Sequence, residues 1–231
     1  MQKTSTKESR SAVVIGGGIV GISCALFLQR DGWMVTVVDP SDPGSPDQTS
    51  YGNAGSISSS SVMPTALPGV IKQVPKMLAD PTGPLAIQWR YLPRLLPFLA
   101  SFLRYSSRAN VEASGRAIAA LIHRVSDAYA ILLEETGTQE MVKPNGPLKV
   151  YKSDQSFAAS AFERELLERN NCRYEILNED ELRQLEPGLQ PIFKHAVFMP
   201  DSSTAVNPGR MVARFAEIFV AKGGIIIRGE A

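Results

Sequence analysis

The sequence predicts an α/β protein whose parallel sheet is divided by an inserted α+β domain. Two patterns support this prediction. Residues 11–39 run through a short apolar strand, a glycine turn, a helix and a second strand, as in a βαβ unit. Residues 207–228 repeat the helix-then-strand order much later in the chain. Because the pattern changes after residue 61, we expect residues 56–195 to form most of a second domain.

The composition is that of an ordinary globular protein. The chain has 231 residues, of which 44% are hydrophobic and 20% are charged, enough for a large core. Its 24 basic and 23 acidic side chains give no overall field to attract an anionic lipid surface or nucleic acid, and we expect no nucleic-acid partner. Cys24 and Cys172 are too few for a disulfide framework or a metal site, so we expect no metal and reduced, cytosolic thiols.

No charged residue lies between Arg10 and Arg30, so this run has to be distinguished from a membrane span or a secretory signal. Residues 12–15 are typical of a short buried strand, and residues 34–38 of a second one. Between them, glycines crowd the part where a spanning helix prefers bulky side chains: Gly16, Gly17, Gly18 and Gly21. These features favour a glycine turn between a strand and a helix over the membrane and signal interpretations.

The spacing Gly16-x-Gly18-x-x-Gly21 is a dinucleotide-binding fingerprint. Gly16 allows a tight turn, Gly18 lets a pyrophosphate approach the backbone, and Gly21 lets the helix pack close to the sheet. The helix beginning near Ile19 directs its free N–H groups at the phosphates. Asp39 ends the second strand, where a carboxylate can accept hydrogen bonds from ribose hydroxyls. No arginine directly follows Asp39, which disfavours NADP.

The pattern continues as Gly21-x-x-x-Ala25 and then Gly32, and here the sequence resembles the FAD-binding proteins of the glutathione-reductase type. Within that class it resembles the D-amino-acid oxidase and dehydrogenase superfamily. The stretch TSYGNAG at residues 49–55 is similar to the T-S-x-x-N-A-G segment of bacterial D-amino-acid dehydrogenases. The resemblance implies FAD as the cofactor, a Rossmann-like FAD-binding domain, and a TSYGNAG segment that runs along the flavin.

Small residues in the TSYGNAG segment let backbone amides approach a cofactor, and its polar side chains can bond phosphate or ring atoms. The alternative is a solvated Ser/Gly loop, which residues 56–61 resemble, but the upstream fingerprint favours cofactor contact. We therefore expect the cofactor to contact Gly16, Gly17, Gly18, Ile19, Gly21, Asp39, Thr49, Ser50, Asn53, Ala54 and Gly55. No residue is typical of a catalytic acid, base or carboxylate-binding arginine, so the catalytic residues stay unassigned.

The stretch LAIQWRYLPRLLPFLASFLRY at residues 85–105 is apolar but carries Arg90, Arg94 and Arg104. Its longest uncharged run is too short to span a bilayer. The stretch fits either an amphipathic segment on a membrane surface or a helix packed in the inserted domain with its arginines in solvent. We favour the second interpretation. The first stays open because the resembled dehydrogenases pass electrons to membrane quinones.

The remaining elements follow from periodicity and capping residues. We expect a helix over residues 112–136, a strand over 148–151, a helix over 157–167 and a strand over 174–177. Asn178 and Glu181 form a capping box for a short helix. Asn207-Pro208 starts a helix that ends at Gly223-Gly224, before an apolar strand over residues 225–227.

The predicted domain boundaries follow from these elements. They are a disordered lead over residues 1–10, FAD-binding segments over 11–55 and 196–231, and a substrate domain over 56–195. Members of the resembled superfamily are usually longer, and their remaining part holds further sheet strands and a segment that contacts the flavin. We therefore expect an N-terminal fragment whose FAD-binding domain is incomplete at the C-terminus.

For the whole protein, the resemblance implies oxidation of an amine, in the first place a D-amino acid. A hydride passes to FAD, and the resulting imine is hydrolysed to a keto acid. The same scaffold serves sarcosine, glycine, hydroxyproline and 2-hydroxy acids, which the sequence does not separate, and a non-catalytic nucleotide-binding fragment is a third hypothesis. Expected partners are the amino-acid substrate and a quinone or other electron acceptor. We expect no transmembrane span, and a location in the cytoplasm or at the cytoplasmic face of the inner membrane.

Overall fold

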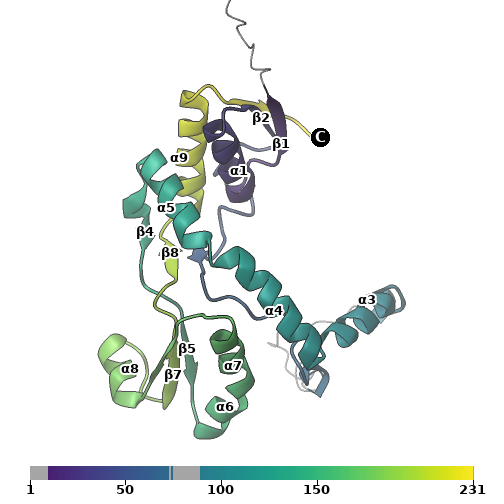
Figure 1. The fold of residues 1–231 in the computed structure, drawn as a ribbon, viewed down its shortest axis with the longest axis vertical. Helices are drawn as coiled ribbons and strands as arrows, with labels where there is room; N and C mark the ends of the chain where they lie inside the picture. Colours follow the sequence, from purple (N-terminus) through teal and green to yellow (C-terminus); the bar gives the residue numbers. More distant parts are fainter. Residues whose placement is uncertain (1–9, 73, 75–88, 231) are drawn as a thin grey trace, which may run out of the picture. The chain divides into compact units, whose positions relative to one another are not determined.

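The computed structural model describes residues 10–72, 74 and 89–230 (Figure 1). Contacts divide the chain into two compact units. Unit 1 consists of Met1–Ile57, Val125–Gly146 and Ser202–Ala231, and unit 2 consists of Ser58–Arg124 and Pro147–Asp201. The chain therefore leaves unit 1 twice and returns to it twice. The predicted disordered lead lies outside the described residues, apart from Arg10.

In the described residues, unit 1 is built on a parallel sheet of β1 (Ser11–Ile15), β2 (Met34–Asp39) and β9 (Ile225–Arg228), in the order β1-β2-β9. Thr36 in the middle strand lies opposite Val13 on one side and Ile225 on the other. The early and late parts of the sequence pattern thus meet in one sheet. This confirms the predicted α/β fold with a divided parallel sheet.

Two helices cover one face of this sheet. α1 (Ile19–Arg30) follows the glycine turn. α9 (Pro208–Ala221) begins at the predicted cap, where the Asn207 side chain accepts a hydrogen bond from the Arg210 N–H at 2.9 Å. The core between the helices and the sheet includes the fully buried residues Ile22, Leu26, Val37, Phe215 and Phe219. Burial of one such side chain contributes about 1.5–3 kcal/mol, so this core fixes α1 and the turn before it.

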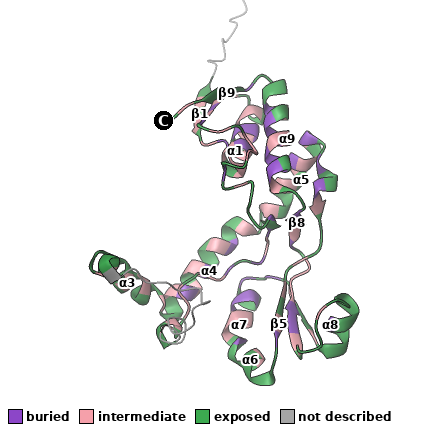
Figure 2. Cartoon of the chain, turned by 180° about the vertical axis from the view of Figure 1, so that it is seen from behind, coloured by how far each residue is buried: buried purple, intermediate pink, exposed green. Residues whose placement is uncertain are grey.

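The opposite face of the sheet carries exposed apolar residues. Figure 2 shows the burial of the residues along the chain. Val13 and Ile15 on β1 are 67% and 74% exposed, and Ile225 and Ile227 on β9 are 57% and 49% exposed. The spacing of these residues follows the two-residue period of a strand. Among the residues that the structure describes, no helix covers this face, so the sheet carries its helices on one side.

Unit 1 also contains a small antiparallel sheet that the sequence analysis missed. β3 (Ser56–Ile57) and β4 (Val142–Lys143) pair with the two sides of β8 (Ser203–Ala205). These strands are too short to give an alternating pattern in the sequence. α5 (Val125–Thr136) packs into the core of the same unit through Leu132. The small sheet brings the TSYGNAG segment beside the start of α9.

Unit 2 combines an antiparallel sheet with helices. β5 (Leu148–Tyr151) and β6 (Glu175–Leu177) flank β7 (His195–Phe198). Among its described helices are α3 (Leu92–Tyr105), α4 (Arg108–Ile122), α6 (Asp154–Ala159), α7 (Ala161–Arg169) and α8 (Glu179–Leu185). The strand predicted over residues 148–151 and the capping box of Asn178 and Glu181 are confirmed.

Two helices predicted as continuous are divided in the structure. Residues 112–136 belong to α4 and α5, with a break at Arg124, and the helix expected over 157–167 breaks at Ser160. At the first break the Arg124 N–H donates to the Leu121 carbonyl, three residues back. This bond closes a tighter turn than the α-helical bond, which reaches four residues back. No glycine or proline marks either break, so apolar periodicity alone does not reveal them.

The break at Arg124 is also where the chain passes from unit 2 to unit 1. Residues 125–146 therefore lie in the same compact unit as the parallel sheet, whereas the predicted boundaries place them in the insert. The last segment of unit 1 begins at Ser202, a few residues after the predicted boundary at 196.

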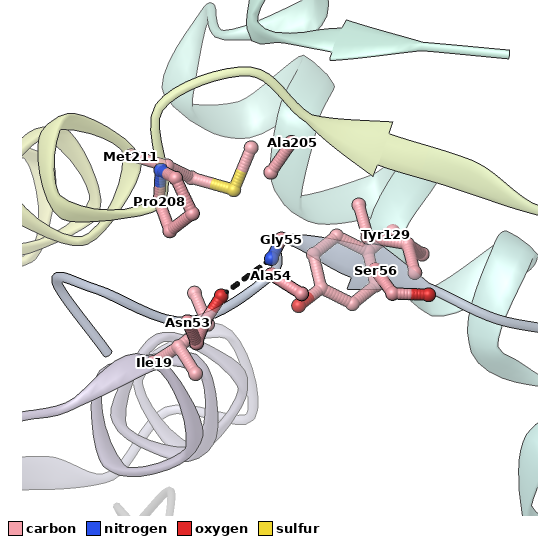
Figure 3. A pocket seen from close by; sticks show the side chains of 10 residues that line it. Ile19, Asn53, Ala54, Gly55, Ser56, Tyr129, Ala205, Pro208 and Met211 are labelled. Carbon is pink, nitrogen blue, oxygen red and sulfur yellow. Dashed lines mark hydrogen bonds between the residues drawn. The ribbon is translucent and has the colours of Figure 1, made fainter. Parts of the chain in front are cut away.

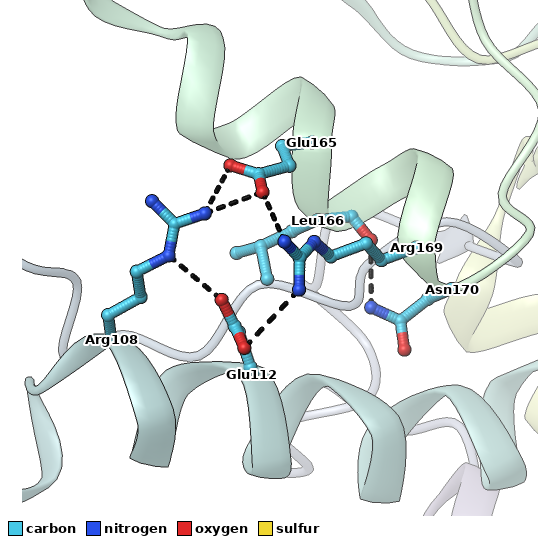
Figure 4. A network of polar contacts seen from close by, with 6 residues as sticks. All are labelled: Arg108, Glu112, Glu165, Leu166, Arg169 and Asn170. Atoms are coloured by element: carbon cyan, nitrogen blue, oxygen red, sulfur yellow. Dashed lines mark hydrogen bonds and ion pairs between the residues drawn. The ribbon is translucent and has the colours of Figure 1, made fainter.

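An ion-pair network joins α4 to α7 within unit 2 (Figure 4). Arg108 donates to Glu112 at 2.9 Å and to the two carboxylate oxygens of Glu165 at 2.5 and 2.6 Å. Arg169 completes the network, at 2.7 Å from Glu165 and 3.4 Å from Glu112. The arginines are more than half exposed, whereas the neighbouring Leu166 is fully buried. Burial of Leu166 therefore contributes more to the cohesion of unit 2 than these solvated charges do.

Candidate functional site

The turn between β1 and α1 has a geometry that requires glycine at two positions. Gly16 adopts a φ of +100°, and its N–H donates to the Val38 carbonyl at 2.8 Å, which ties the turn to β2. A Cβ atom at Gly21 would lie 1.8 Å from the Gly16 carbonyl oxygen and 3.3 Å from the Val14 side chain. The helix thus approaches the turn more closely than any side chain at this position permits.

The N-terminus of α1 presents free hydrogen-bond donors beside a hydroxyl group. Gly18 is the N-cap residue, and the Ile19 N–H donates to Ser50 Oγ at 3.0 Å. Within the described part of the chain, the N–H groups of Gly18 and Val20 have no hydrogen-bond partner. A Cβ at Gly18 would lie 2.9 Å from Ser50 Oγ, so the missing side chain keeps this space open. Free N–H groups and the helix dipole suit such an end to binding an anion.

Ser50 itself lies where the fingerprint predicts a phosphate. Its oxygen already accepts the Ile19 N–H, but its hydroxyl hydrogen can still be donated to a phosphate oxygen. A phosphate at this end of α1 would therefore either share the site with the Ser50 hydroxyl or displace it from the Ile19 N–H.

The carboxylate of Asp39 is buried, with 8% of the residue's surface exposed, and accepts two backbone hydrogen bonds. Oδ2 accepts from the Gly17 N–H at 2.6 Å, and Oδ1 accepts from the Ser41 N–H at 2.7 Å. Burial by itself raises the pKa of Asp39, but these hydrogen bonds outweigh burial, so the pKa lies below its ordinary value of 3.8. Asp39 thus closes the glycine turn, a role the sequence analysis did not include. A second lone pair on each oxygen remains for a ribose hydroxyl.

Gln48 is a buried residue beside this carboxylate that the sequence analysis missed. Its Oε1 accepts from the Gly44 N–H at 2.8 Å, and a Cβ at Gly44 would come within 2.3 Å of the Gly209 carbonyl of α9. Among the described residues, no atom accepts a well-formed hydrogen bond from Gln48 Nε2. The Gln48 side chain nevertheless lies near enough to Asp39 to lower the pKa of that carboxylate. An unpaired buried donor is costly unless a ligand or water accepts from it. No sequence pattern marks Gln48.

The TSYGNAG segment is shaped by contacts of its own. Asn53 Oδ1 accepts from the Gly55 N–H at 2.6 Å, which leaves Nδ2 and a second lone pair on Oδ1 for a ligand. Gly55 has a φ of +65°, and a Cβ there would lie 2.4 Å from the Ala205 carbonyl oxygen. The Ala205 N–H donates to the Gly55 carbonyl at 2.7 Å, which fixes the segment beside β8. Thr49 and Ala54 are exposed.

A pocket of about 270 Å³ lies within unit 1, between the TSYGNAG segment, α5 and the start of α9 (Figure 3). It is lined by Ile19, Asn53, Ala54, Gly55, Ser56, Ile57, Tyr129, Ala205, Pro208 and Met211. Burial raises the pKa of Tyr129 above its ordinary value of 10.0, so its hydroxyl stays protonated and can donate a hydrogen bond. Because pockets for small molecules measure about 300–1,000 Å³, this one would hold only part of a large ligand.

The structure brings most of the predicted cofactor residues together. Gly18, Ile19 and Ser50 meet at the start of α1, and Ile19 also lines the pocket. The other predicted pocket residues are Asn53, Ala54 and Gly55, while Gly16, Gly17, Gly21 and Asp39 form the turn itself. The sequence analysis missed the contribution of α5 and α9 to the pocket. In the sequence, Tyr129 is part of an apolar helical stripe and Pro208 is part of a helix start. Both patterns are explained by the helices alone, so neither indicates a pocket.

The region that contains this site matches one protein-family model. Residues 11–231 match DAO, described as FAD dependent oxidoreductase. The chain belongs to this family. This match confirms the family and the FAD-binding fold that the resemblance implied, for nearly the whole chain.

Curated relatives carry two related names. The chain is 38% identical over 225 residues to a D-amino-acid oxidase of Bradyrhizobium diazoefficiens, an alignment that covers 97% of this chain and 53% of the relative. It is 29% identical over 196 residues to a D-amino acid dehydrogenase of Vibrio vulnificus, with 84% and 47% covered. The chain therefore spans about half the length of the curated relatives it matches.

Solved structures show the same fold at lower identity. An L-amino acid deaminase from Proteus vulgaris, with its specific insertion sequence deleted, matches 98% of this chain and 46% of its own, with a TM-score of 0.60 and 17% identity. Glycine oxidase from Geobacillus kaustophilus matches 94% of this chain and 45% of its own, with a TM-score of 0.56 and 16% identity. At these identities the likeness concerns the fold alone.

The chemistry of the site fits FAD, the cofactor of the DAO family. A diphosphate needs hydrogen-bond donors and space, and the start of α1 offers both because a Cβ at Gly18 would fill that space. A ribose offers hydroxyl groups, which match the carboxylate of Asp39. The small residues and the Tyr129 hydroxyl of the pocket suit a further part of the same molecule.

Proposed function

We propose that the protein to which this chain belongs uses FAD to oxidise an amine, in the first place a D-amino acid. The observation that carries the proposal is the start of α1 at Gly18, open and beside the Ser50 hydroxyl, in a chain 38% identical to a D-amino-acid oxidase. Flavin, when bound, supplies the two-electron oxidation chemistry that amino-acid side chains lack.

In this proposal the residues of unit 1 hold and orient the cofactor. The free N–H groups of Gly18 and Val20 and the hydroxyl of Ser50 bind the pyrophosphate oxygens. Asp39 accepts hydrogen bonds from a ribose, and its buried charge is kept ionised by the two backbone donors that it already has. The pocket beside Tyr129 encloses part of the cofactor and keeps water from it. The protein's contribution is thus positioning and electrostatics.

We assign cofactor binding to unit 1 and a share of the substrate site to unit 2. The parallel sheet and the fingerprint turn both belong to unit 1. Because unit 1 also contains residues 125–146, the proposed cofactor domain is larger than residues 11–55 and 196–231 alone. Unit 2, with its antiparallel sheet, corresponds to most of the predicted insert.

The alternative substrates are sarcosine, glycine, hydroxyproline and 2-hydroxy acids, and a nucleotide-binding chain without catalysis is a third possibility. Even if the substrate reached the pocket that we assign to the cofactor, the polar side chains that line it are those of Asn53, Ser56 and Tyr129. None of these carries a charge that would select a substrate carboxylate or ammonium group. The catalytic residues therefore remain unassigned.

The electron acceptor is part of the proposal. Relatives carry both the name oxidase and the name dehydrogenase, so the acceptor that we propose is a quinone or another compound, with oxygen as the alternative. With a quinone as acceptor, the protein would work at the cytoplasmic face of the inner membrane, because quinones are dissolved in the bilayer.

The test is anaerobic reduction of the flavin in the complete protein. The gene that contains this chain is expressed, oxygen is removed, and the absorbance at about 450 nm is followed as single amines are added. The panel contains D- and L-amino acids, sarcosine, glycine, hydroxyproline and 2-hydroxy acids. We expect D-amino acids to bleach the absorbance fastest.

Other outcomes select the alternatives. Bleaching by sarcosine or a hydroxy acid, but not by D-amino acids, would replace the proposed substrate. Bound flavin that no compound bleaches would favour nucleotide binding without catalysis. A complete protein that binds no flavin would overturn the proposal.

A further inference from the structure

We propose that α3 in unit 2 is a surface helix that binds an anionic lipid bilayer. The proposal goes beyond the proposed function and does not depend on it, because it concerns a helix outside the cofactor site. It starts from the burial of this helix. α3 has 14 residues, and none of them is buried. Among the described elements, its main contacts are with the short 3-10 turn Trp89–Tyr91 that precedes it.

Several exposed side chains of α3 are large and apolar. Leu96 is 56% exposed, Phe98 is 60% exposed and Leu103 is 41% exposed. Tyr91 and Tyr105, at its two ends, are 52% and 58% exposed. Single exposed apolar residues are common on soluble proteins, but a contiguous set on one helix indicates a surface that binds something.

Most apolar residues of α3 form a wide stripe along one side, on which Leu96 and Leu103 are exposed and the others are half-buried. Its leucines and Phe102 recur at the intervals i, i+3, i+4, i+7, i+10 and i+11, which place them on one face: Leu92, Leu95, Leu96, Leu99, Phe102 and Leu103. At 100° per residue, Arg94, Ser101 and Arg104 project from the opposite side. Leucine and aromatic residues on one face and arginines on the other are typical of helices that lie in the interface plane of membranes.

The charges around this helix are of one sign. No acidic residue lies between Asp80 and Glu112 in the sequence. In the part of the chain that the structure describes, Arg90, Arg94 and Arg104 form no ion pair, whereas Arg108 is paired with Glu112. The whole chain has a net charge of only +1, so this cationic surface is local. An anionic surface would be complementary to the charge of this helix.

Charge and shape together favour lipid over a second copy of the chain. Two copies packed through the leucine face of α3 would leave Arg94 and Arg104, on the opposite side, with no anionic group to compensate them. A bilayer surface supplies anionic headgroups for the arginines and acyl chains for the leucine face, and tyrosines such as Tyr91 and Tyr105 prefer the boundary between the two. The helix would lie on the bilayer, since no helix among the described residues has the length and apolarity to cross it.

The test is sedimentation of the full chain with vesicles. One set contains phosphatidylcholine and phosphatidylglycerol at about 3:1, and the other contains phosphatidylcholine alone; each basic residue near an anionic surface adds about a fivefold gain in binding. We expect at least tenfold tighter binding to the anionic vesicles, weakened by added salt. The double variant Arg94→Glu/Arg104→Glu should lose this gain, and Leu96→Ser/Leu103→Ser should lose binding to both sets.

The matched control is Arg116→Glu/Arg124→Glu, which makes the same change of charge at exposed arginines outside α3. This control should bind anionic vesicles as the unaltered chain does. Because no residue of α3 is buried, all variants should keep their unfolding midpoint in urea. Flavin content is measured in the same preparations, so that a failure of cofactor binding is seen separately from a failure of lipid binding.

Three results would overturn the proposal. One is equal binding of the chain to both vesicle sets. Another is a loss of binding in the Arg116→Glu/Arg124→Glu control as large as in the α3 charge variant. The third is a dimer in the absence of lipid that Leu96→Ser/Leu103→Ser dissociates, because the apolar face would then be covered by a second copy.

Discussion

At Gly21 a single hydrogen atom, in place of a side chain, lets α1 reach the turn that precedes it. In Gly21→Ala the new Cβ would lie 1.8 Å from the Gly16 carbonyl oxygen, which is backbone and cannot rotate away. We expect this variant to lose about 3 kcal/mol or more of unfolding free energy, measured by urea denaturation. The control is Gly188→Ala, where the new Cβ meets no atom within 4 Å. Equal midpoints for the two variants would contradict the close packing of α1.

Asp39 should make stability depend on pH in the acid range. Its pKa in the folded chain lies below the ordinary value of 3.8, so its contribution is complete above about pH 4 and is lost as the pH falls through the folded value. In Asp39→Asn this contribution is absent at every pH. We therefore expect the gap in urea midpoint between the original chain and the variant to be wide at pH 7 and to narrow toward pH 3. A gap that stays constant would show that the Asp39 charge is not stabilised in the folded chain.

At the scale of elements, the contact between α4 and α7 separates packing from surface charge. Leu166→Ala removes a fully buried side chain and should lower the unfolding free energy by about 2–5 kcal/mol. Glu165→Gln removes two ion pairs that are open to solvent and should change stability little, and less still at high salt. Urea denaturation at low and high salt measures both. A larger loss from Glu165→Gln than from Leu166→Ala would mean that the network of Figure 4 holds the helices together.

The elements that the sequence predicted are those with local signals. The caps at Asn178 and Asn207 and the strand over residues 148–151 depend on a few neighbouring residues, and the structure contains all three. The break at Arg124 and the strand Ser203–Ala205 depend instead on packing between segments far apart in the chain, which no local pattern contains.

The same distinction applies to the candidate site. The glycine fingerprint and Asp39 lie in one βαβ unit, so their proximity follows from the spacing alone. Tyr129 and Met211 reach the pocket from α5 and α9, and Gln48 is held by Gly44 next to α9. Their proximity to the turn results from the tertiary fold. The hydrogen bond from Gly17 to Asp39 was also unpredictable, because nothing in the sequence shows that the carboxylate turns toward the backbone.

At the scale of the whole molecule, the two units should respond differently to FAD. A ligand that binds the folded state raises the free energy of opening of the part it contacts. We expect added FAD to slow amide hydrogen exchange in the turn at residues 16–22 and in the segment at 49–57. Exchange in the core of unit 2, around Leu166 and Val197, should not change. Slower exchange in unit 2 alone would show that FAD binds unit 2 and would contradict the assignment to unit 1.

The central claim is that the side-chain-free start of α1 receives the diphosphate of FAD. It is tested most directly by the flavin absorbance, at about 450 nm, of the purified chain, of Gly18→Val and of the control Gly188→Val, all saturated with FAD and then freed of unbound cofactor. We predict close to one flavin per chain in the original and in the control, and none in Gly18→Val, because its branched side chain fills the space beside Ser50. Gly18→Val that retains as much flavin as Gly188→Val would contradict the claim.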